Sequence, residues 1–306
     1  SVSVSVSVSV SVSVSVSVSV SVSVSVSVSV SVSVSVSVSV SVSSQHGHGH
    51  GRPSARGSGF FVRAERGVSW LATVHRSDPD AFEIRRTGPP PLPCAARDVV
   101  AALSPLVTDR RRERIREVVA ARATNVTAIL EDIADPHNAS AILRSADAFG
   151  VQHVHVIPGI NGFHASRSVA KGTHHWLDVY RHESAAGCVG HLRERGFRVL
   201  VASMEGTVMP EELAKLDKVA IVFGNEHKGP TPAMRDLADG TYAVPMKGFV
   251  ESLNVSVAAG ITLYEATRGR RGELPDDERE ILEARYLLTC VRDAERVVRD
   301  HLAARR

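Results

Sequence analysis

The chain has 306 residues, but positions 1–42 are an unbroken Ser-Val alternation, so residues 45–306, 262 in all, carry the specific information. That length fits one domain or two small ones. All 36 Lys and Arg and all 33 Asp and Glu lie in this part, and a hydrophobic content of 43% allows a sizeable core. Wholly disordered, collagen-like and disulfide-scaffold proteins are therefore excluded. The net charge of +3 is modest, so basic binding surfaces are expected to be local.

The three cysteines, Cys94, Cys188 and Cys290, share no Cys-x-x-Cys spacing and cannot all form pairs. This pattern favours a reducing, cytoplasmic location and argues against a structural zinc site, so no metal is expected. No segment after the Ser-Val tract is apolar enough to predict a membrane span.

The tract over residues 1–44 is of low complexity. It has no basic region before it and no cleavage site, so we expect neither a signal peptide nor a transmembrane helix. A period of two with a β-branched residue suits a strand with one valine face, and an exposed copy would be prone to cross-β stacking. We interpret the tract as a repeat expansion or a mis-set start, with a β-rich assembly tail as the less favoured alternative.

Residues 45–105 are rich in Gly, Pro, His and Arg and are expected to form a disordered linker. His46, His48 and His50 alternate with glycine. This tract could bind a metal, but no carboxylate or thiolate lies nearby to fix the geometry, so a solvated tract is favoured. The brief alternation over residues 60–84 is too short for a core of its own.

From Thr108 the pattern is typical of an α/β protein. Thr108 or Asp109 can cap a helix to about Arg122, which has one apolar stripe. The rest of this helix is basic and either contacts phosphate or forms a solvated face; its arginines are Arg110, Arg111, Arg112, Arg114 and Arg116.

Strands and helices then alternate, which predicts a largely parallel sheet. Strands are expected over residues 126–130, 151–157, 197–202 and 219–223, and a further segment spans 242–246. Helices are expected from about Asn138 to Gly150, over 184–195, after Pro210, and from about Leu253 to Arg268. One last amphipathic helix is expected from Asp276 to about Leu302.

Three loops that follow strands carry unusual residues. The first runs from Asp135 to Arg144, with Asn138 at the expected helix cap, and the second from Gly224 to Gly229 around Glu226. The third runs from Val244 to Ala258 and includes Ser252 and Asn254. Parallel sheets bind ligands beyond the carboxyl ends of their strands, so these loops are where we expect a site.

Each loop alone has an ordinary structural interpretation. Asn138 is by default a helix cap, Glu226 a loop carboxylate, and Ser252 with Asn254 a capping pair. The Gly-x-Gly-x-x-Gly fingerprint, the P-loop and the Gly-x-Ser-x-Gly elbow are all missing, so an ordinary nucleotide-binding enzyme or a serine hydrolase lacks its usual support.

Taken together and in this order, the three segments resemble the SpoU/TrmH family of RNA ribose 2′-O-methyltransferases, in the SPOUT class. The resemblance extends from about Leu106 to Arg270 and includes the loop Gly172 to Trp176. It implies an α/β fold whose C-terminal part forms a trefoil knot, an exception to the rule against knots. It also implies that the protein is a homodimer, that it binds S-adenosylmethionine, and that it does not associate with a membrane.

By position, the resemblance assigns three sets of residues. The catalytic and RNA-facing set is Arg144, Asn138, Glu226, Ser252 and Asn254. The cofactor set is Ala202, Gly224, Val244, Met246 and Leu253. The RNA-contacting set is Arg114, Arg268 and Arg270, which matches the tRNA-specific branch that methylates guanosine 18 of the D-loop.

The resemblance also divides the chain and leaves alternatives. It places the methyltransferase domain at 106–270 and a C-terminal helical extension at 271–306. The family account makes Arg144 the residue that activates the ribose hydroxyl, but a guanidinium is a poor base, so a phosphate clamp is favoured. The alternatives are an rRNA 2′-O-methyltransferase and an RNA-binding assembly factor without catalysis. Glu251, an extra carboxylate beside Ser252, would weaken RNA binding if it faces inward.

Overall fold

The chain divides into two units, Ser1–Ala72 and Thr73–Arg306. A computed structural model describes residues 2–20, 26–44, 80–85, 87–160, 162–270 and 274–305. In the first unit, β1 (Val2–Val20) pairs antiparallel with β2 (Val26–Ser44), which confirms that the Ser-Val alternation suits a strand. The His-x-His-x-His tract and most of the predicted linker lie outside the described residues.

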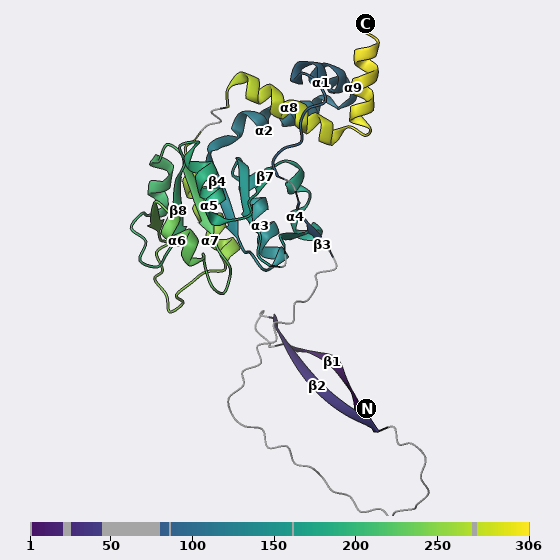
Figure 1. The fold of residues 1–306 in the computed structure, drawn as a ribbon, viewed down its shortest axis with the longest axis vertical. Coiled ribbons are helices and arrows are strands. Elements are labelled where there is room, and N and C mark those ends of the chain that lie inside the picture. Colours follow the sequence, from purple (N-terminus) through teal and green to yellow (C-terminus); the bar gives the residue numbers. More distant parts are fainter. Residues whose placement is uncertain are drawn as a thin grey trace, which may run out of the picture. The chain divides into compact units, whose positions relative to one another are not determined.

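The second unit is built on a six-stranded sheet in which every neighbouring pair is parallel (Figure 1). The strand order is β10 (Gly240–Tyr242), β8 (Arg198–Ala202), β9 (Val219–Phe223), β4 (Ala123–Glu131), β5 (Val151–Ile157) and β7 (Asp178–Arg181). The predicted parallel α/β sheet is confirmed. Strand β7 was not predicted from the sequence.

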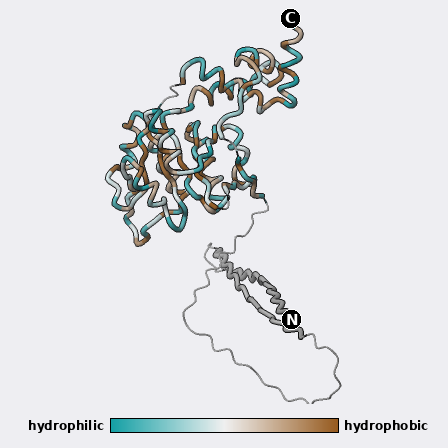
Figure 2. Tube along the Cα trace, in the orientation of Figure 1, coloured by the Kyte–Doolittle hydropathy of each residue, from teal (hydrophilic) through white to brown (hydrophobic). Residues whose placement is uncertain are grey.

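Both faces of the sheet are covered, which is why its central strands are nearly continuous apolar runs. One face packs against α3 (Pro136–Ala148) and α7 (Val255–Thr267), and Leu143 and Leu263 are fully buried there. The other face packs against α5 (Ala185–Arg193) and α6 (Pro232–Leu237). Figure 2 shows hydrophobic strands with more hydrophilic helices outside them.

Shorter elements complete this domain. They are β3 (Ala81–Glu83), β6 (His164–Ser166), α4 (Arg167–Ala170), η2 (Thr173–His175) and the 3₁₀ helix η3 (Pro210–Lys215). The strand β3 pairs antiparallel with β6. Within the described residues, no helix is both long enough and apolar enough to cross a bilayer.

The prediction of a disordered linker over 45–105 is wrong for its described C-terminal part. Residues 80–105 contain β3 and the helix α1 (Ala96–Leu103), whose Val99 and Leu103 are fully buried. The apolar stripe of α1 is only two turns long, and it is stable because it packs on helices from the other end of the chain, so local composition did not reveal it.

The helices that pack on α1 form a second hydrophobic core, separate from the core that covers the sheet (Figure 1). The contacts join α1 and α2 (Asp109–Ala121) to α8 (Asp276–Cys290), and α1 to α9 (Ala294–Ala303). Thr108 caps α2, as predicted, by accepting a hydrogen bond from the Arg111 amide. The predicted C-terminal helical extension therefore packs with helices that precede the sheet.

The prediction of one helix from Asp276 to about Leu302 is wrong. The α8 helix ends at Cys290, and Asp293 lies in the left-handed region with φ of 53° before α9 begins. Asp tolerates this conformation better than most residues. The break turns Ala294 and Val298 into the second core, so tertiary packing overrides the continuous amphipathic pattern.

A buried arginine links the two cores. The Arg122 side chain is 1% exposed and pairs with Asp147 at 2.5 Å. It also donates to the Tyr286 hydroxyl of α8 at 2.9 Å and to the Asp147 and Val151 carbonyls. Tyr286 in turn donates to the Trp176 carbonyl at 3.0 Å. A buried guanidinium is costly unless its donors find acceptors. These contacts therefore fix α8, and with it the second core, against the sheet.

Candidate active site

The predicted loops meet along one edge of the sheet. Strands β10, β8, β9 and β4 are adjacent and parallel, so their carboxyl ends lie at the same edge. Ala202 is the last residue of β8 and pairs with Tyr242 at the end of β10, while Gly224 follows β9 directly. Residues far apart in the sequence are thus brought together by the register of the strands.

Glu226 joins the first two loops. Its Oε2 accepts a hydrogen bond from the Ala134 amide at 3.0 Å. Its Oε1 accepts from the Asp135 amide at 3.1 Å and from Asn138 Nδ2 at 3.0 Å. One carboxylate therefore binds two backbone amides before α3 and one side chain in the first turn of α3.

Asn138 extends this network to the third loop. Its Oδ1 accepts from Asn254 Nδ2 at 3.1 Å, and Asn254 Oδ1 accepts from the Ser256 amide at 2.8 Å as the cap of α7. The expectation that Asn138 caps α3 is wrong: Asp135 is the cap, through the His137 amide at 2.8 Å. Because Asp135 fills the capping role, the Asn138 side chain is available to connect Glu226 with Asn254.

A cavity of about 380 Å³ lies over this network. Of the predicted residues, it brings together Asn138, Glu226, Ser252, Leu253 and Asn254. Its remaining lining residues are Ala134, Asp135, His227 and Val255. The cavity is thus lined by residues of all three predicted loops.

Arg144 does not line this cavity. It lies six residues after Asn138 on α3, about 9 Å further along the helix axis. The side chain is exposed, and its Nη1 donates to the Val169 carbonyl at 3.2 Å. The guanidinium is therefore anchored beside α4, and other donors of its fork are available to a ligand.

Of the predicted cofactor residues, Ala202 ends β8, Gly224 follows β9, and Val244 and Met246 follow β10, whereas Leu253 precedes the cap of α7 and is the one of the five that lines the cavity. Ala202 is exposed, and Val244, Met246 and Leu253 are partly exposed. Gly224 is buried, and a Cβ atom there would overlap the backbone of Gly229 and Pro230. The loop after β9 therefore folds back on itself in a way that only glycine allows.

The predicted RNA-contacting arginines differ in their surroundings. Arg114 is exposed and pairs with Glu117 at 3.0 Å, and Arg268 is exposed and pairs with Glu265 at 3.1 Å. Arg270 instead donates to the carbonyls of Ala266, Leu213, Leu216 and Asp217. Its guanidinium is committed to closing the end of α7 onto η3, which indicates a structural role.

Sequence reasoning missed the residues that attach the loop after β9 to β4. Glu131 is 3% exposed and accepts from the Thr231 amide at 2.9 Å and from Thr231 Oγ1 at 2.7 Å. Asn225 Nδ2 donates to the Asp132 carbonyl at 2.9 Å. The sequence signal was Glu131-Asp132 directly after a buried strand, where a carboxylate needs partners.

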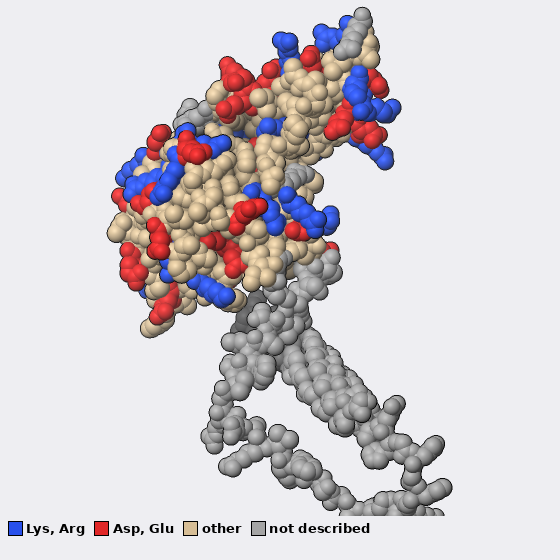
Figure 3. Space-filling model, in the orientation of Figure 1, with Lys and Arg blue, Asp and Glu red and all other residues tan. Residues whose placement is uncertain are grey.

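The surface charge is mixed. Figure 3 shows Lys and Arg side chains interspersed with Asp and Glu over the face drawn. Arg110 and Arg111 at the start of α2 are exposed, whereas Arg112 pairs with Asp109, and Arg116 with Glu283 at 3.1 Å. Basic and acidic side chains are thus mixed on the face drawn.

Comparison with known proteins identifies the family. Residues 125–264 match the model of the SpoU rRNA Methylase family. The tRNA (guanosine(18)-2′-O)-methyltransferase of Thermus thermophilus is 38% identical over 164 residues, which are 53% of this chain and 84% of that protein. The enzyme of the same name from Escherichia coli is 36% identical over 53% of this chain and 71% of its own length.

Two further proteins extend the comparison. The 23S rRNA (guanosine-2′-O-)-methyltransferase of Shewanella oneidensis is 36% identical over 47% of this chain and 59% of its own length. The crystal structure of the Aquifex aeolicus TrmH/SpoU tRNA modifying enzyme matches with a TM-score of 0.55 and 28% identity, covering 60% of this chain and 98% of that one. The chain therefore belongs to the SpoU family of RNA methyltransferases.

Proposed function

We propose that this chain is an S-adenosylmethionine-dependent RNA 2′-O-methyltransferase that modifies guanosine 18 of tRNA. The observation that carries the proposal is the hydrogen-bonded connection of Glu226, Asn138 and Asn254 across three separate loops at one cavity. The names of the relatives at 36–38% identity support the tRNA target.

The carboxyl edge of β8, β9 and β10 fits the cofactor. Gly224 lets the loop after β9 fold back tightly on itself, and the partly exposed side chains of Val244, Met246 and Leu253 offer apolar contacts. Together with Ala202, these residues would hold S-adenosylmethionine, which supplies a sulfonium methyl group for in-line attack by a ribose 2′-oxygen.

The residues of the cavity act by positioning. Glu226 holds the turn before α3, and Asn254 holds the start of α7, so that Asn138 stands fixed between them. Ser252 lies exposed on the rim, where its hydroxyl can meet RNA. Alignment of two reactants within a few tenths of an ångström accounts for much of a transfer rate.

Arg144 is proposed to clamp the phosphate beside the reacting ribose and to stabilise the developing alkoxide. A guanidinium stays protonated at ordinary pH, so the hydroxyl proton passes to phosphate or water instead. The anchoring bond to the Val169 carbonyl uses one donor of Arg144. A fork of further donors remains for a bidentate phosphate contact.

A homodimer and a C-terminal knot belong to the same proposal. The apolar side chains of Val257, Ile261 and Tyr264 on α7 are 50%, 39% and 52% exposed and share one helix face. An exposed apolar face of this kind supports a symmetric interface, because a twofold contact uses the same patch on both subunits. Light scattering of an Ile261→Asp variant, expected to be monomeric, tests it.

RNA contacts are proposed for Arg114 and Arg268, which are exposed. The pairs with Glu117 and Glu265 are surface ion pairs of small energy, so phosphate can replace the carboxylate.

A cytoplasmic location fits the three free thiols, Cys94, Cys188 and Cys290. The second candidate target is rRNA, which the Shewanella relative's name supports.

The test is methyl transfer by the full chain. The protein is incubated with labelled S-adenosylmethionine and unmodified tRNA, a tRNA with adenosine at position 18, or large-subunit rRNA. Methylated ribose is then located by nuclease digestion and mass spectrometry. Label at the 2′-oxygen of guanosine 18 is expected. Label in rRNA alone would show that the substrate is rRNA and not tRNA. No label in any RNA would favour an RNA-binding assembly factor without catalysis.

A further inference from the structure

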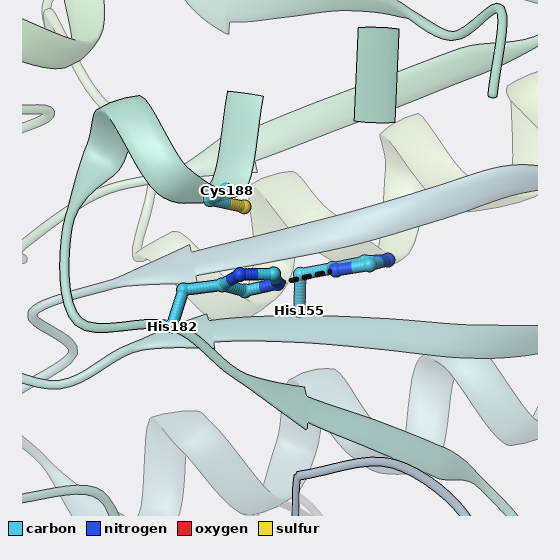
Figure 4. A group of neighbouring side chains, drawn as sticks. All are labelled: His155, His182 and Cys188. Carbon is cyan, nitrogen blue, oxygen red and sulfur yellow. Dashed lines mark hydrogen bonds between the residues drawn. The ribbon is translucent and has the colours of Figure 1, made fainter. Parts of the chain in front are cut away.

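Three metal-binding side chains from different elements meet on the α5 side of the sheet. His155 lies in β5, His182 directly follows β7, and Cys188 lies in α5 (Figure 4). One nitrogen of each histidine and the Cys188 Sγ all lie within 4.8 Å of one another. Nδ1 of His155 and Nε2 of His182 are hydrogen-bonded at 2.8 Å.

Two of the three residues, His155 and Cys188, are buried, and burial favours their uncharged forms. His155 is 3% exposed and Cys188 is fully buried. Burial and the neighbouring histidines lower the pKa of His155 to about 2, and burial with the nearby Glu131 raises the pKa of Cys188 to about 12. Polar groups in an apolar core cost free energy unless they gain a partner.

The proposed methyltransferase site does not account for this cluster. None of the three residues lines the cavity beside Glu226. The surroundings are aromatic: Tyr180 stacks on His155 at 5.0 Å between ring centroids. The His191 ring lies 5.5 Å from that of His155 and 5.3 Å from that of His182.

We propose that His155, His182 and Cys188 bind one zinc ion. Two imidazole nitrogens and one thiolate form a donor set that suits zinc and does not suit Mg²⁺ or Ca²⁺. Water or His191 takes the fourth tetrahedral position. The Zn–S bond forms as the Cys188 thiol releases its proton to water. The imidazole that donates in the present His155–His182 hydrogen bond takes up a proton on its other ring nitrogen and loses the one between the rings to water, so that both imidazoles bind zinc through unprotonated nitrogens and stay neutral.

The geometry needs only side-chain adjustment. Zinc bonds of about 2.1 Å to nitrogen and 2.3 Å to sulfur place tetrahedral ligand atoms about 3.4–3.6 Å apart. The two histidine nitrogens at 2.8 Å must separate by about half an ångström to reach that spacing. The most distant pair of ligand atoms, at most 4.8 Å apart, must close by about 1 Å.

The expected consequence is structural. Within the part of the chain that the structure describes, β7 is the last strand of the sheet and pairs with β5. An ion held by β5, by the residue after β7 and by α5 would fasten that edge to the covering helix. Any ligand that binds the folded chain alone raises its stability by mass action.

The test uses the full chain with the competing groups removed. The background carries His46→Asn, His48→Asn, His50→Asn, Cys94→Ser and Cys290→Ser, which leaves Cys188 as the single cysteine of the three in the chain. Co²⁺ is titrated as a spectroscopic probe and then displaced with Zn²⁺. We expect one equivalent of Co²⁺, with a thiolate-to-cobalt charge-transfer band that Zn²⁺ removes and Mg²⁺ does not.

Variants then assign the ligands. Cys188→Ser should remove the charge-transfer band, and His182→Gln, at a partly exposed position, should weaken Co²⁺ binding by at least about tenfold. The matched control His301→Gln, on α9, should change neither. Absence of the band in the background protein would overturn the proposal. So would a band that survives in Cys188→Ser, or an affinity that His182→Gln leaves unchanged. Methyl transfer is not measured, so the result is independent of the proposed function.

Discussion

The substitution Glu226→Gln tests the connection between the three loops most directly. It keeps the shape of the side chain and removes its charge. The Glu226 Oε1 accepts two hydrogen bonds and Oε2 accepts one, from the Ala134 amide. A Gln amide can keep the first two acceptor contacts with its oxygen, but its NH₂ group then faces the Ala134 N–H, donor against donor.

The magnitude follows from these three bonds. The two retained hydrogen bonds change from charge-assisted to neutral, which weakens each by about 1 kcal/mol, and the third hydrogen bond is lost. Glu226 is partly exposed, so water offsets part of the cost. A net loss of about 2 kcal/mol corresponds to about 30-fold in kcat/KM for methyl transfer, if the loop geometry matters only in the transition state.

The assay is single-turnover methyl transfer to tRNA, with urea unfolding measured on the same samples. Glu251→Gln is the matched control, since it removes an exposed carboxylate from the third loop. A cycle with Asn138→Ala should show a coupling energy, because the two side chains share a hydrogen bond. Activity of Glu226→Gln within twofold of the unchanged chain, or no coupling, would refute the reasoning.

Three further outcomes are expected. Arg144→Ala should reduce turnover at least about 100-fold while S-adenosylmethionine affinity, measured by calorimetry, is unchanged; retained turnover would contradict the assignment. Arg270→Met should lower the free energy of unfolding by about 3 kcal/mol, because four carbonyls lose their donor; weaker tRNA binding at unchanged stability would instead restore an RNA contact. Deletion of residues 1–72 should leave urea unfolding unchanged, whereas deletion of 1–105 removes α1 and should cost about 4 kcal/mol or more; equal midpoints for the two deletions would show that α1 contributes nothing.

The second core shows where composition misleads. The Pro run before α1 and the short apolar stripe of Val99 and Leu103 have no periodicity long enough to distinguish a helix from a linker. Likewise, no Gly or Pro marks the break at Asp293 between α8 and α9. Both features depend on contacts between the two ends of the 73–306 unit.

The candidate site likewise has features that the sequence predicts and features that only the tertiary structure determines. The sequence by itself determined the parallel α/β sheet, the helix that begins at Thr108 or Asp109 and the three loops with their polar residues, because hydrophobic periodicity and turn residues are local properties. Only the tertiary structure decided that Asn138 connects Glu226 to Asn254 rather than capping α3, and that Arg270 closes η3. It also brought His155, His182 and Cys188 together. Side-chain partners depend on which strands become neighbours, and residues 131 and 231, or 155 and 188, meet only after the sheet has formed.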